Sequence, residues 1–111
     1  NIAKRLIETA AKAGADAVKF QSFKAELVIS KNAKKAEYQV QNTGNESESQ
    51  LEMVKKLELD EKAHDELIAY AKSKNIEFLS TPFDLPSVDL LVKKGLKIIK
   101  IPSGEITNLP Y

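Results

Sequence analysis

The stretch GADAVKFQ, at residues 14–21, indicates how this chain folds. Before it, apolar residues recur at helical spacing, and Gly14 ends that run as a helix C-cap. Residues 15–21 then form a short apolar segment that is typical of a strand. The same order of helix and strand follows twice more, with strands expected at residues 76–80 and 96–101. Such alternation implies right-handed crossovers and a parallel sheet, so the sequence predicts an α/β fold with about three parallel strands.

The helices and loops between these strands carry local signals. Asp60 and Asp84 are expected to be the N-caps of the helices before and after the second strand. Residues 22–46 form a long polar stretch, and a loop of that length in a compact domain is usually functional. Ser47 and Gln50 match a capping box at the start of a short helix.

The composition excludes several classes of protein. Seventeen basic and sixteen acidic residues are interleaved along the chain, which argues against a nucleic-acid-binding arm. No apolar run approaches the roughly 20 residues that cross a bilayer, so no membrane partner is expected. The absence of Cys excludes disulfides, thiolate metal sites and a Cys nucleophile, and it fits a cytoplasmic protein. No linker divides residues 1–111, which are interpreted as one piece of a single, longer domain.

His64 is the only histidine of the chain and Arg5 is the only arginine. A lone histidine next to Asp65 and Glu66 is interpreted as a solvated helix residue, and it cannot build a metal site or a Ser-His-Asp triad by itself. Because there is a single arginine, any anion site in this chain must use lysines and backbone amides.

Two lysines interrupt the apolar pattern of the predicted strands at corresponding positions. Lys19 should lie opposite the face that carries Phe20, and Lys100 opposite the face that carries Ile99, because side chains alternate along a strand. Both ammonium groups would then project into the middle of the sheet or barrel, where an uncompensated charge is costly. We therefore expect both lysines to face a cavity that binds an anionic ligand. The structural alternative is that they reach a sheet edge or pair with acids elsewhere in the fold.

Hydroxyl groups follow the second and third predicted strands. Ser80 and Thr81, and then Ser103 with Gly104, offer hydroxyls and free amides at the carboxyl edge of the sheet, where a phosphate is favoured. Catalytic residues of α/β barrels gather at the same edge. This signal gains weight from its agreement with the two lysines.

Four blocks of sequence resemble, in order and in spacing, the N-terminal barrel of the N-acetylneuraminate (sialic acid) synthase family. They are GADAVKFQ at 14–21, KAEY at 35–38, LSTPFD at 79–84 and KIPSGE at 100–105. The first two are more similar to the N-acetylneuraminate and legionaminate branches than to the pseudaminate branch. The resemblance spans essentially the whole chain and implies a partial (β/α)8 TIM barrel, of which residues 1–111 would supply about three strands.

The resemblance also implies a reaction and the residues that perform it. The family condenses phosphoenolpyruvate with an N-acetylated sugar, such as N-acetylmannosamine, to a nine-carbon 2-keto sugar acid and phosphate. The implied catalytic residues are Lys19, Lys100 and Glu105. The implied substrate contacts are Lys19 and Lys100 with the charges of phosphoenolpyruvate, Thr81 and Ser103 with its hydrogen-bonding groups, Gln21 and Asn45 with the sugar, and Glu105 with the reacting end of the sugar.

Other parts of the family machinery are expected outside this chain. The resemblance implies a divalent metal, Mn²⁺ or Mg²⁺, whose histidine ligands would follow Tyr111, so that this chain supplies no metal ligand. It also implies a homodimer for the full-length protein. We therefore expect the 111-residue chain alone to bind metal poorly and to be catalytically inactive.

Two other readings of the same residues remain open. Another phosphoenolpyruvate-condensing barrel or an aldolase barrel would fit, and the aldolase would form a Schiff base at Lys19 or Lys100 that borohydride traps. A non-catalytic α/β module would hold a phosphate-bearing ligand with the same two lysines and without metal. The acceptor sugar also stays open among N-acetylmannosamine, a bacillosamine-derived sugar and a 6-phosphorylated sugar.

Overall fold

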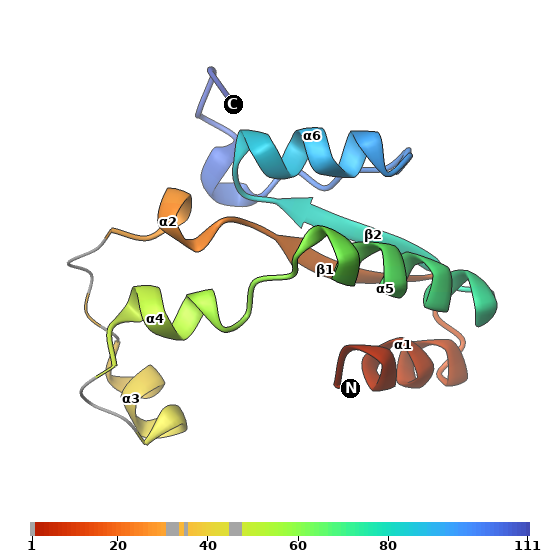
Figure 1. Ribbon diagram of the computed structural model, residues 1–111, viewed down its shortest axis with the longest axis horizontal. Helices are drawn as coiled ribbons and strands as arrows, with labels where there is room; N and C mark the ends of the chain where they lie inside the picture. The colour runs from red at the N-terminus through yellow and green to blue at the C-terminus, as the bar shows by residue number, and fades with distance from the viewer. Residues whose placement is uncertain (1, 31–33, 35, 45–47) are drawn as a thin grey trace.

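The computed structural model describes residues 2–30, 34, 36–44 and 48–111. Two parallel strands lie at the centre of these residues, and helices precede, connect and follow them (Figure 1). In chain order the elements are α1 (Ile2–Lys12), β1 (Ala17–Ser22), α2 (Ala25–Val28), α3 (Glu37–Thr43), α4 (Gln50–Lys55), α5 (Glu61–Ser73), β2 (Glu77–Pro82), α6 (Leu85–Lys93) and the 3-10 turn η1 (Ser103–Glu105). The predicted α/β class with parallel strands is confirmed.

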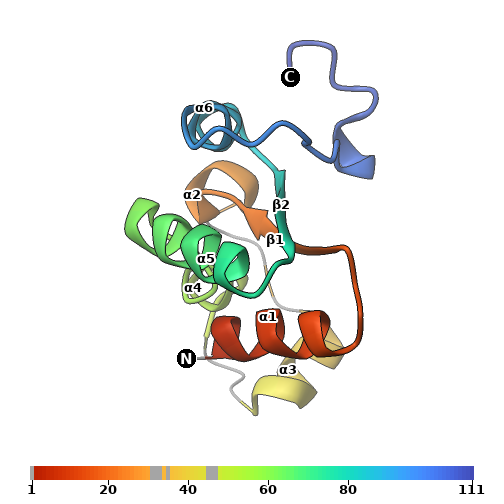
Figure 2. The ribbon, with the colours of Figure 1, turned by 90° about the vertical axis from the view of Figure 1, so that its right-hand side faces the viewer.

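The strands β1 and β2 pair in parallel, with Lys19 opposite Leu79 and Gln21 opposite Thr81. Both strands run toward the left in Figure 1, so that their carboxyl ends meet at one edge. Figure 2 shows α1 and α5 together on one side of the strand pair, while the C-terminal segment lies on the far side from them. This is the arrangement of a βαβ unit, whose helices cover one face of the sheet.

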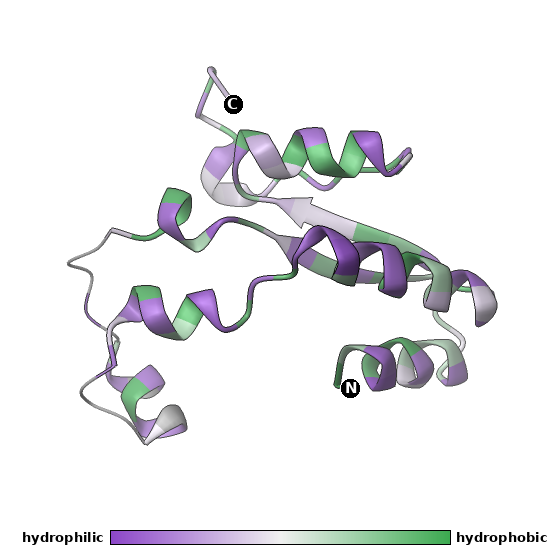
Figure 3. Cartoon of the chain, in the orientation of Figure 1, coloured by the Kyte–Doolittle hydropathy of each residue, from purple (hydrophilic) through white to green (hydrophobic). Residues whose placement is uncertain are grey.

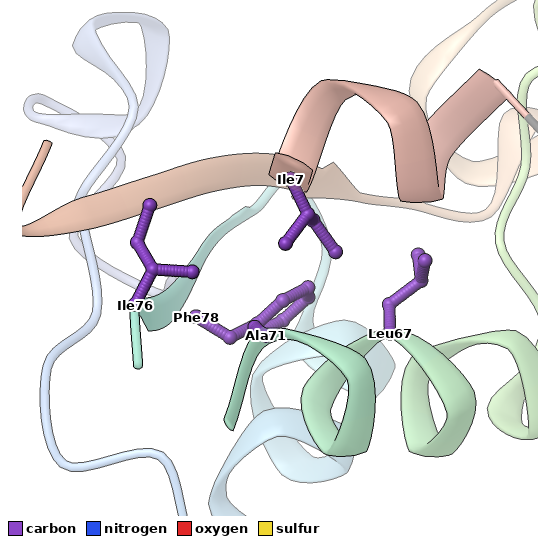
Figure 4. Close-up of a cluster of buried hydrophobic side chains, with 5 residues drawn as sticks. All are labelled: Ile7, Leu67, Ala71, Ile76 and Phe78. Atoms are coloured by element: carbon purple, nitrogen blue, oxygen red, sulfur yellow. The ribbon is translucent and has the colours of Figure 1, made fainter. Parts of the chain in front are cut away.

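The apolar core lies between the strands and these two helices. Ile7 of α1, Leu67 and Ala71 of α5, and Ile76 and Phe78 around the start of β2 are all buried and point toward one another (Figure 4). Burial of such side chains contributes about 1.5–3 kcal/mol each, which fixes the helices against this face of the sheet.

The helix starts and ends follow local sequence signals. Asp60 accepts a hydrogen bond from Ala63 N at 2.7 Å, and Asp84 accepts one from Ser87 N at 2.8 Å, so both predicted N-caps are confirmed. Gly14 and Gly95 end α1 and α6 with φ of 79° and 80°, a region that glycine enters without steric cost. These residues determine where each of these helices begins or ends.

The capping box is shifted from its predicted place. The N-cap of α4 is Ser49, which accepts from Glu52 N, and the Glu52 side chain accepts from Ser49 N in return. The predicted pair of Ser47 and Gln50 is wrong, because Gln50 is already the first residue of the helix; Ser47 itself lies outside the described residues. The predicted loop at residues 22–46 also contains two short helices, α2 and α3.

The third predicted strand is not formed. Residues 96–101 carry no strand, and no backbone hydrogen bond joins them to β2 in the described part of the chain. A β-strand needs a neighbour that satisfies its backbone groups in a ladder, and the apolar alternation of a segment does not supply one. The segment instead leads from α6 to η1 as extended chain without a partner (Figure 1).

Candidate functional site

The two faces of the strand pair differ in character. Side chains alternate, so Val18, Phe20 and Ser22 share one face with Phe78 and Ser80; we call this the helix-side face. The Phe20 and Phe78 rings stack at 5.4 Å between centroids, and both residues pack in the core. The prediction that the Phe20 face packs on helices is therefore confirmed.

The opposite face carries the predicted site residues of both strands. Lys19, Gln21, Leu79 and Thr81 lie on it, and we call it the open face. Gln21 and Thr81 are paired neighbours at its carboxyl end, so the parallel register brings together two residues that are far apart in the sequence. In Figure 3, β2 changes from green, apolar residues to pale, more hydrophilic residues toward its arrowhead.

Lys19 and Lys100 do not occupy corresponding places. Lys19 lies on a strand and on the open face, as predicted, whereas Lys100 lies in the segment that forms no strand. Both are exposed, and neither side chain makes a hydrogen bond or ion pair with a described residue. The expectation that both ammonium groups project into a covered interior is therefore not met within this chain, because the segments around them do not enclose them.

Thr81 differs from its neighbours on the open face. It is 2% exposed, and its Oγ1 has no hydrogen-bond partner among the described residues. A buried hydroxyl without a partner costs about 1–3 kcal/mol relative to a satisfied one. The hydrogen-bonding capacity of this atom is therefore unused among the described residues.

The turn η1 carries two further site residues at the same edge. Ser103 is exposed, and Glu105 is half-buried and accepts a hydrogen bond from Asn108 Nδ2 at 2.6 Å. Tyr111 Oη donates to Pro82 O at 2.8 Å, which ties the C-terminal segment to the end of β2. Burial raises the pKa of Tyr111, and the negative charges of Glu105 and Asp84 raise it further. Of the predicted site residues after α6, Glu105 therefore lies near Tyr111, whose hydroxyl contacts the carboxyl end of β2.

Two carboxylates hold the loops at this edge, and sequence reasoning identified only one of their bonds. Asp84 accepts from Ser87 N as a cap and also from Lys24 N at 2.7 Å, so that it joins the loop after β2 to the loop after β1. Glu58 accepts from Ala25 N at 2.9 Å. The N-terminus of α2 is thus fixed by acids from two other loops, which sets the direction in which the chain leaves Gln21.

Gln21 also lines an apolar groove of about 690 Å³ beside α1 and α4. Its wall includes Phe23, Leu59 and Phe83. Asn45, which was expected to contact the sugar, lies outside the described residues, as does Lys35 of the KAEY block.

His64 is not a solvated helix residue, and that prediction is wrong. It is 1% exposed, and its Nε2 lies 2.7 Å from Ser22 Oγ, which in turn lies 2.6 Å from Ser80 Oγ. A signal for this burial was present in the sequence, because His64 precedes Leu67 and Ala71 at the spacing of one helix face. The acidic neighbours Asp65 and Glu66 lie on the exposed side of the same helix.

A metal site is not assembled by the described residues. No three His, Asp or Glu side chains in residues 2–30, 34, 36–44 and 48–111 come together as ligands. Helices that could span a membrane are also not found in the described part of the chain, since none is both long and apolar enough.

A family model and individual sugar-acid synthases both match nearly the whole of this chain. Residues 6–111 match the NeuB family. A relative from Campylobacter jejuni, "N,N'-diacetyllegionaminic acid synthase", is 71% identical over all 111 residues, which cover 33% of that relative. A protein of the same description from Legionella pneumophila is 54% identical over 99% of this chain and 31% of its own length.

Solved structures share the fold. The N-acetylneuraminic acid (sialic acid) synthetase of Leptospira borgpetersenii, crystallised with citrate, superposes with a TM-score of 0.80 and 33% identity over 99% of this chain and 33% of its own. The spore coat polysaccharide biosynthesis protein SpsE of Bacillus subtilis matches with a TM-score of 0.63 and 33% identity over 97% of this chain and 26% of its own. The chain therefore spans about a third of the length of the curated relatives it matches.

Proposed function

This chain belongs to the NeuB family, and on that premise we propose that it forms part of the catalytic barrel of a synthase that condenses phosphoenolpyruvate with an N-acetylated sugar. In this reaction C3 of phosphoenolpyruvate attacks the aldehyde carbon of the open-chain sugar, and water adds at C2. The C2–O bond to phosphate then breaks, which yields a nine-carbon 2-keto sugar acid and inorganic phosphate. The names of the two most similar relatives described above favour a diacetylated, bacillosamine-derived acceptor.

The residues of this chain divide between the two substrates. Lys19 and Lys100 balance the carboxylate and phosphate charges of phosphoenolpyruvate, and their free ammonium groups support this role. Thr81 and Ser103 donate hydrogen bonds to the same substrate. The remaining assignments are Gln21 and Asn45 to the sugar and Glu105 to its reacting end.

The observation that carries the proposal is Thr81. A hydroxyl that is 2% exposed and has no partner in the described structure lies on the same face as Lys19 and beside Gln21. Burial of an unsatisfied polar group is unfavourable, and a bound anion is the group that would offset that cost here.

The complete protein would contain components that the described residues lack. We propose that Mn²⁺ or Mg²⁺ is held by side chains outside this chain, since the described residues assemble no ligand set. We propose a homodimer for the full-length protein. Without those components the 111-residue chain alone should show no turnover.

The test is phosphate release by the full-length protein supplied with phosphoenolpyruvate and a diacetamido sugar, with identification of the 2-keto acid. Thr81→Val should raise the KM for phosphoenolpyruvate about tenfold or more, because a hydrogen bond to a charged group contributes about 1.5–3 kcal/mol. It should not lower the melting temperature and should raise it where the buried hydroxyl is unsatisfied, because Oγ1 has no partner to lose and its burial is unfavourable.

The matched control is Thr9→Val, which removes an exposed hydroxyl on α1 that bonds only to Arg5 O. It should leave the KM unchanged. A wild-type protein that releases no phosphate in the presence of both substrates would contradict the proposal. An adduct that borohydride traps at Lys19 or Lys100 would favour the aldolase instead.

A further inference from the structure

A buried chain of hydrogen bonds crosses from the strands to α5. Ser80 Oγ lies 2.6 Å from Ser22 Oγ, Ser22 Oγ lies 2.7 Å from His64 Nε2, and His64 Nδ1 lies 2.8 Å from Asp60 O. The three side chains are at most 1% exposed. This chain of hydrogen bonds therefore joins the carboxyl ends of both strands to the N-cap of α5 through three buried side chains.

The donor and the acceptor of each hydrogen bond in this series can be assigned, starting from Asp60 O. Asp60 O is a carbonyl oxygen and can only accept, so His64 Nδ1 carries the hydrogen. In the neutral ring Nε2 then accepts, which makes Ser22 its donor. Ser22 Oγ accepts in turn from Ser80, so each group between Ser80 and Asp60 has its partner.

Direct chemistry by these groups is excluded by their position. Ser22 and Ser80 lie on the helix-side face, beneath α5, and a substrate on the open face cannot reach them. Each is, however, the chain neighbour of a proposed substrate contact, since Ser22 follows Gln21 and Ser80 precedes Thr81. Because side chains alternate across a strand, a serine held on one face sets the direction of its neighbour on the other.

We propose that His64 is a positioning residue, which holds Gln21 and Thr81 in the orientation that binds substrate by anchoring Ser22 and Ser80 from behind. This inference rests on the proposed function of those two residues. An apolar trio of similar volume would fill the same space without the desolvation cost of three polar groups, and core stability alone does not require a histidine here. A directed chain of hydrogen bonds adds a fixed geometry, which hydrophobic packing does not.

The test compares His64→Leu with His64→Gln in the full-length protein. Leucine fills the site and removes both ring nitrogens, so the KM for phosphoenolpyruvate should rise about tenfold, since small misplacements in an active site cost up to about a hundredfold. Glutamine places an amide oxygen near the Nε2 position and can accept from Ser22. It should keep the KM within about threefold of wild type.

A matched control separates positioning from stability. Leu67→Ala creates a cavity one turn further along α5, in the apolar core and away from the serines. It should lower the melting temperature and leave the KM unchanged, because a destabilised fold lowers the active fraction and not the affinity of the folded enzyme. An unchanged KM in His64→Leu, or an equal rise in His64→Leu and Leu67→Ala, would overturn the inference.

A second measurement, the NMR methyl resonance of Thr81, tests the inference without any measurement of activity. If the wild-type protein releases no phosphate, the proposed function fails, and the methyl resonance of Thr81 reports the positioning by itself. His64→Leu must shift that resonance, whereas His64→Gln and Leu67→Ala must leave it near its wild-type value. A resonance that does not move in His64→Leu overturns the inference on its own.

Discussion

The helix-side face and the open face of the same two strands differ in whether their polar side chains have partners. On the helix-side face, aromatic rings stack, and each group between Ser80 and His64 has its hydrogen-bond partner. On the open face, the Lys19 side chain is exposed and the Thr81 hydroxyl is buried, and neither has a partner among the residues that the structure describes. One face is thus completed by this chain, whereas the other needs groups that the described residues do not supply. Three of the residues assigned to substrate, Lys19, Gln21 and Thr81, lie on the incomplete face.

The largest effect should follow from removing a charge that the proposal assigns to substrate. Lys100→Ala in the full-length protein should weaken phosphoenolpyruvate binding by about a hundredfold or more, because a buried anion would lose its counter-charge. Calorimetric titration of phosphoenolpyruvate measures the loss. Lys97→Ala is the control, since this residue is exposed on the same segment and has no assigned role. Equal affinities of wild type and Lys100→Ala would contradict the assignment of Lys100 to phosphoenolpyruvate.

An effect of intermediate size, on stability, should distinguish Ser22 in the middle of the buried chain of hydrogen bonds from Ser80 at its end. Ser22→Ala leaves both His64 Nε2 and Ser80 Oγ without a partner and should cost about 1–3 kcal/mol of stability. Ser80→Ala removes only the terminal donor and should cost about 0.5–1.5 kcal/mol. Urea unfolding of the full-length variants measures both losses.

The control for this pair is Ser73→Ala on the exposed end of α5, where the change should stay within about 0.5 kcal/mol. A larger loss of stability in Ser80→Ala than in Ser22→Ala would contradict the placement of Ser22 between His64 and Ser80.

The smallest effect concerns the helices behind the helix-side face. Tyr70 Oη donates to Glu8 Oε1 at 2.6 Å and joins α5 to α1. This hydrogen bond is the largest cause that holds the pKa of Glu8 below its usual value of 4.5; desolvation opposes it, and the nearby charge of Lys74 adds to it. The contribution of Glu8 to stability is therefore present above the unfolded pKa and is lost as the pH falls through the lower, folded pKa.

Urea midpoints of wild type and Glu8→Gln should accordingly differ at neutral pH and converge in acid. Glu77→Gln is the control, because this glutamate is exposed on the open face and its side chain makes no ion pair or hydrogen bond with a described residue. A gap between wild type and Glu8→Gln that widens as the pH falls would contradict the assigned sign.

Features fixed by neighbours in the sequence were predictable. Asp60 and Asp84 cap helices because an N-cap bonds to an amide three residues ahead. Gly14 and Gly95 end helices because the left-handed turn lies at the residue itself. The alternation of Lys19 with Phe20 likewise follows from the strand repeat alone, and the structure places them on opposite faces as expected.

Features that depend on distant segments were predicted less well. Residues 96–101 have the alternation of a strand but no neighbour to pair with. His64 was assigned to solvent because its chain neighbours are acidic, although its contacts come from Ser22, 42 residues earlier. The second bond of Asp84, to Lys24 N, spans 60 residues and leaves no trace in either local sequence.

The sequence alone determined the first two strands and the helices around them, the caps at Asp60 and Asp84, and the placement of Lys19 opposite the packed face, since each depends on backbone geometry within a few residues. The tertiary structure alone decided which polar groups are satisfied. It supplied Ser22 with His64, left Thr81 Oγ1 unpaired and kept Lys100 off a strand, because burial and hydrogen bonding are set by segments that meet only after the chain folds.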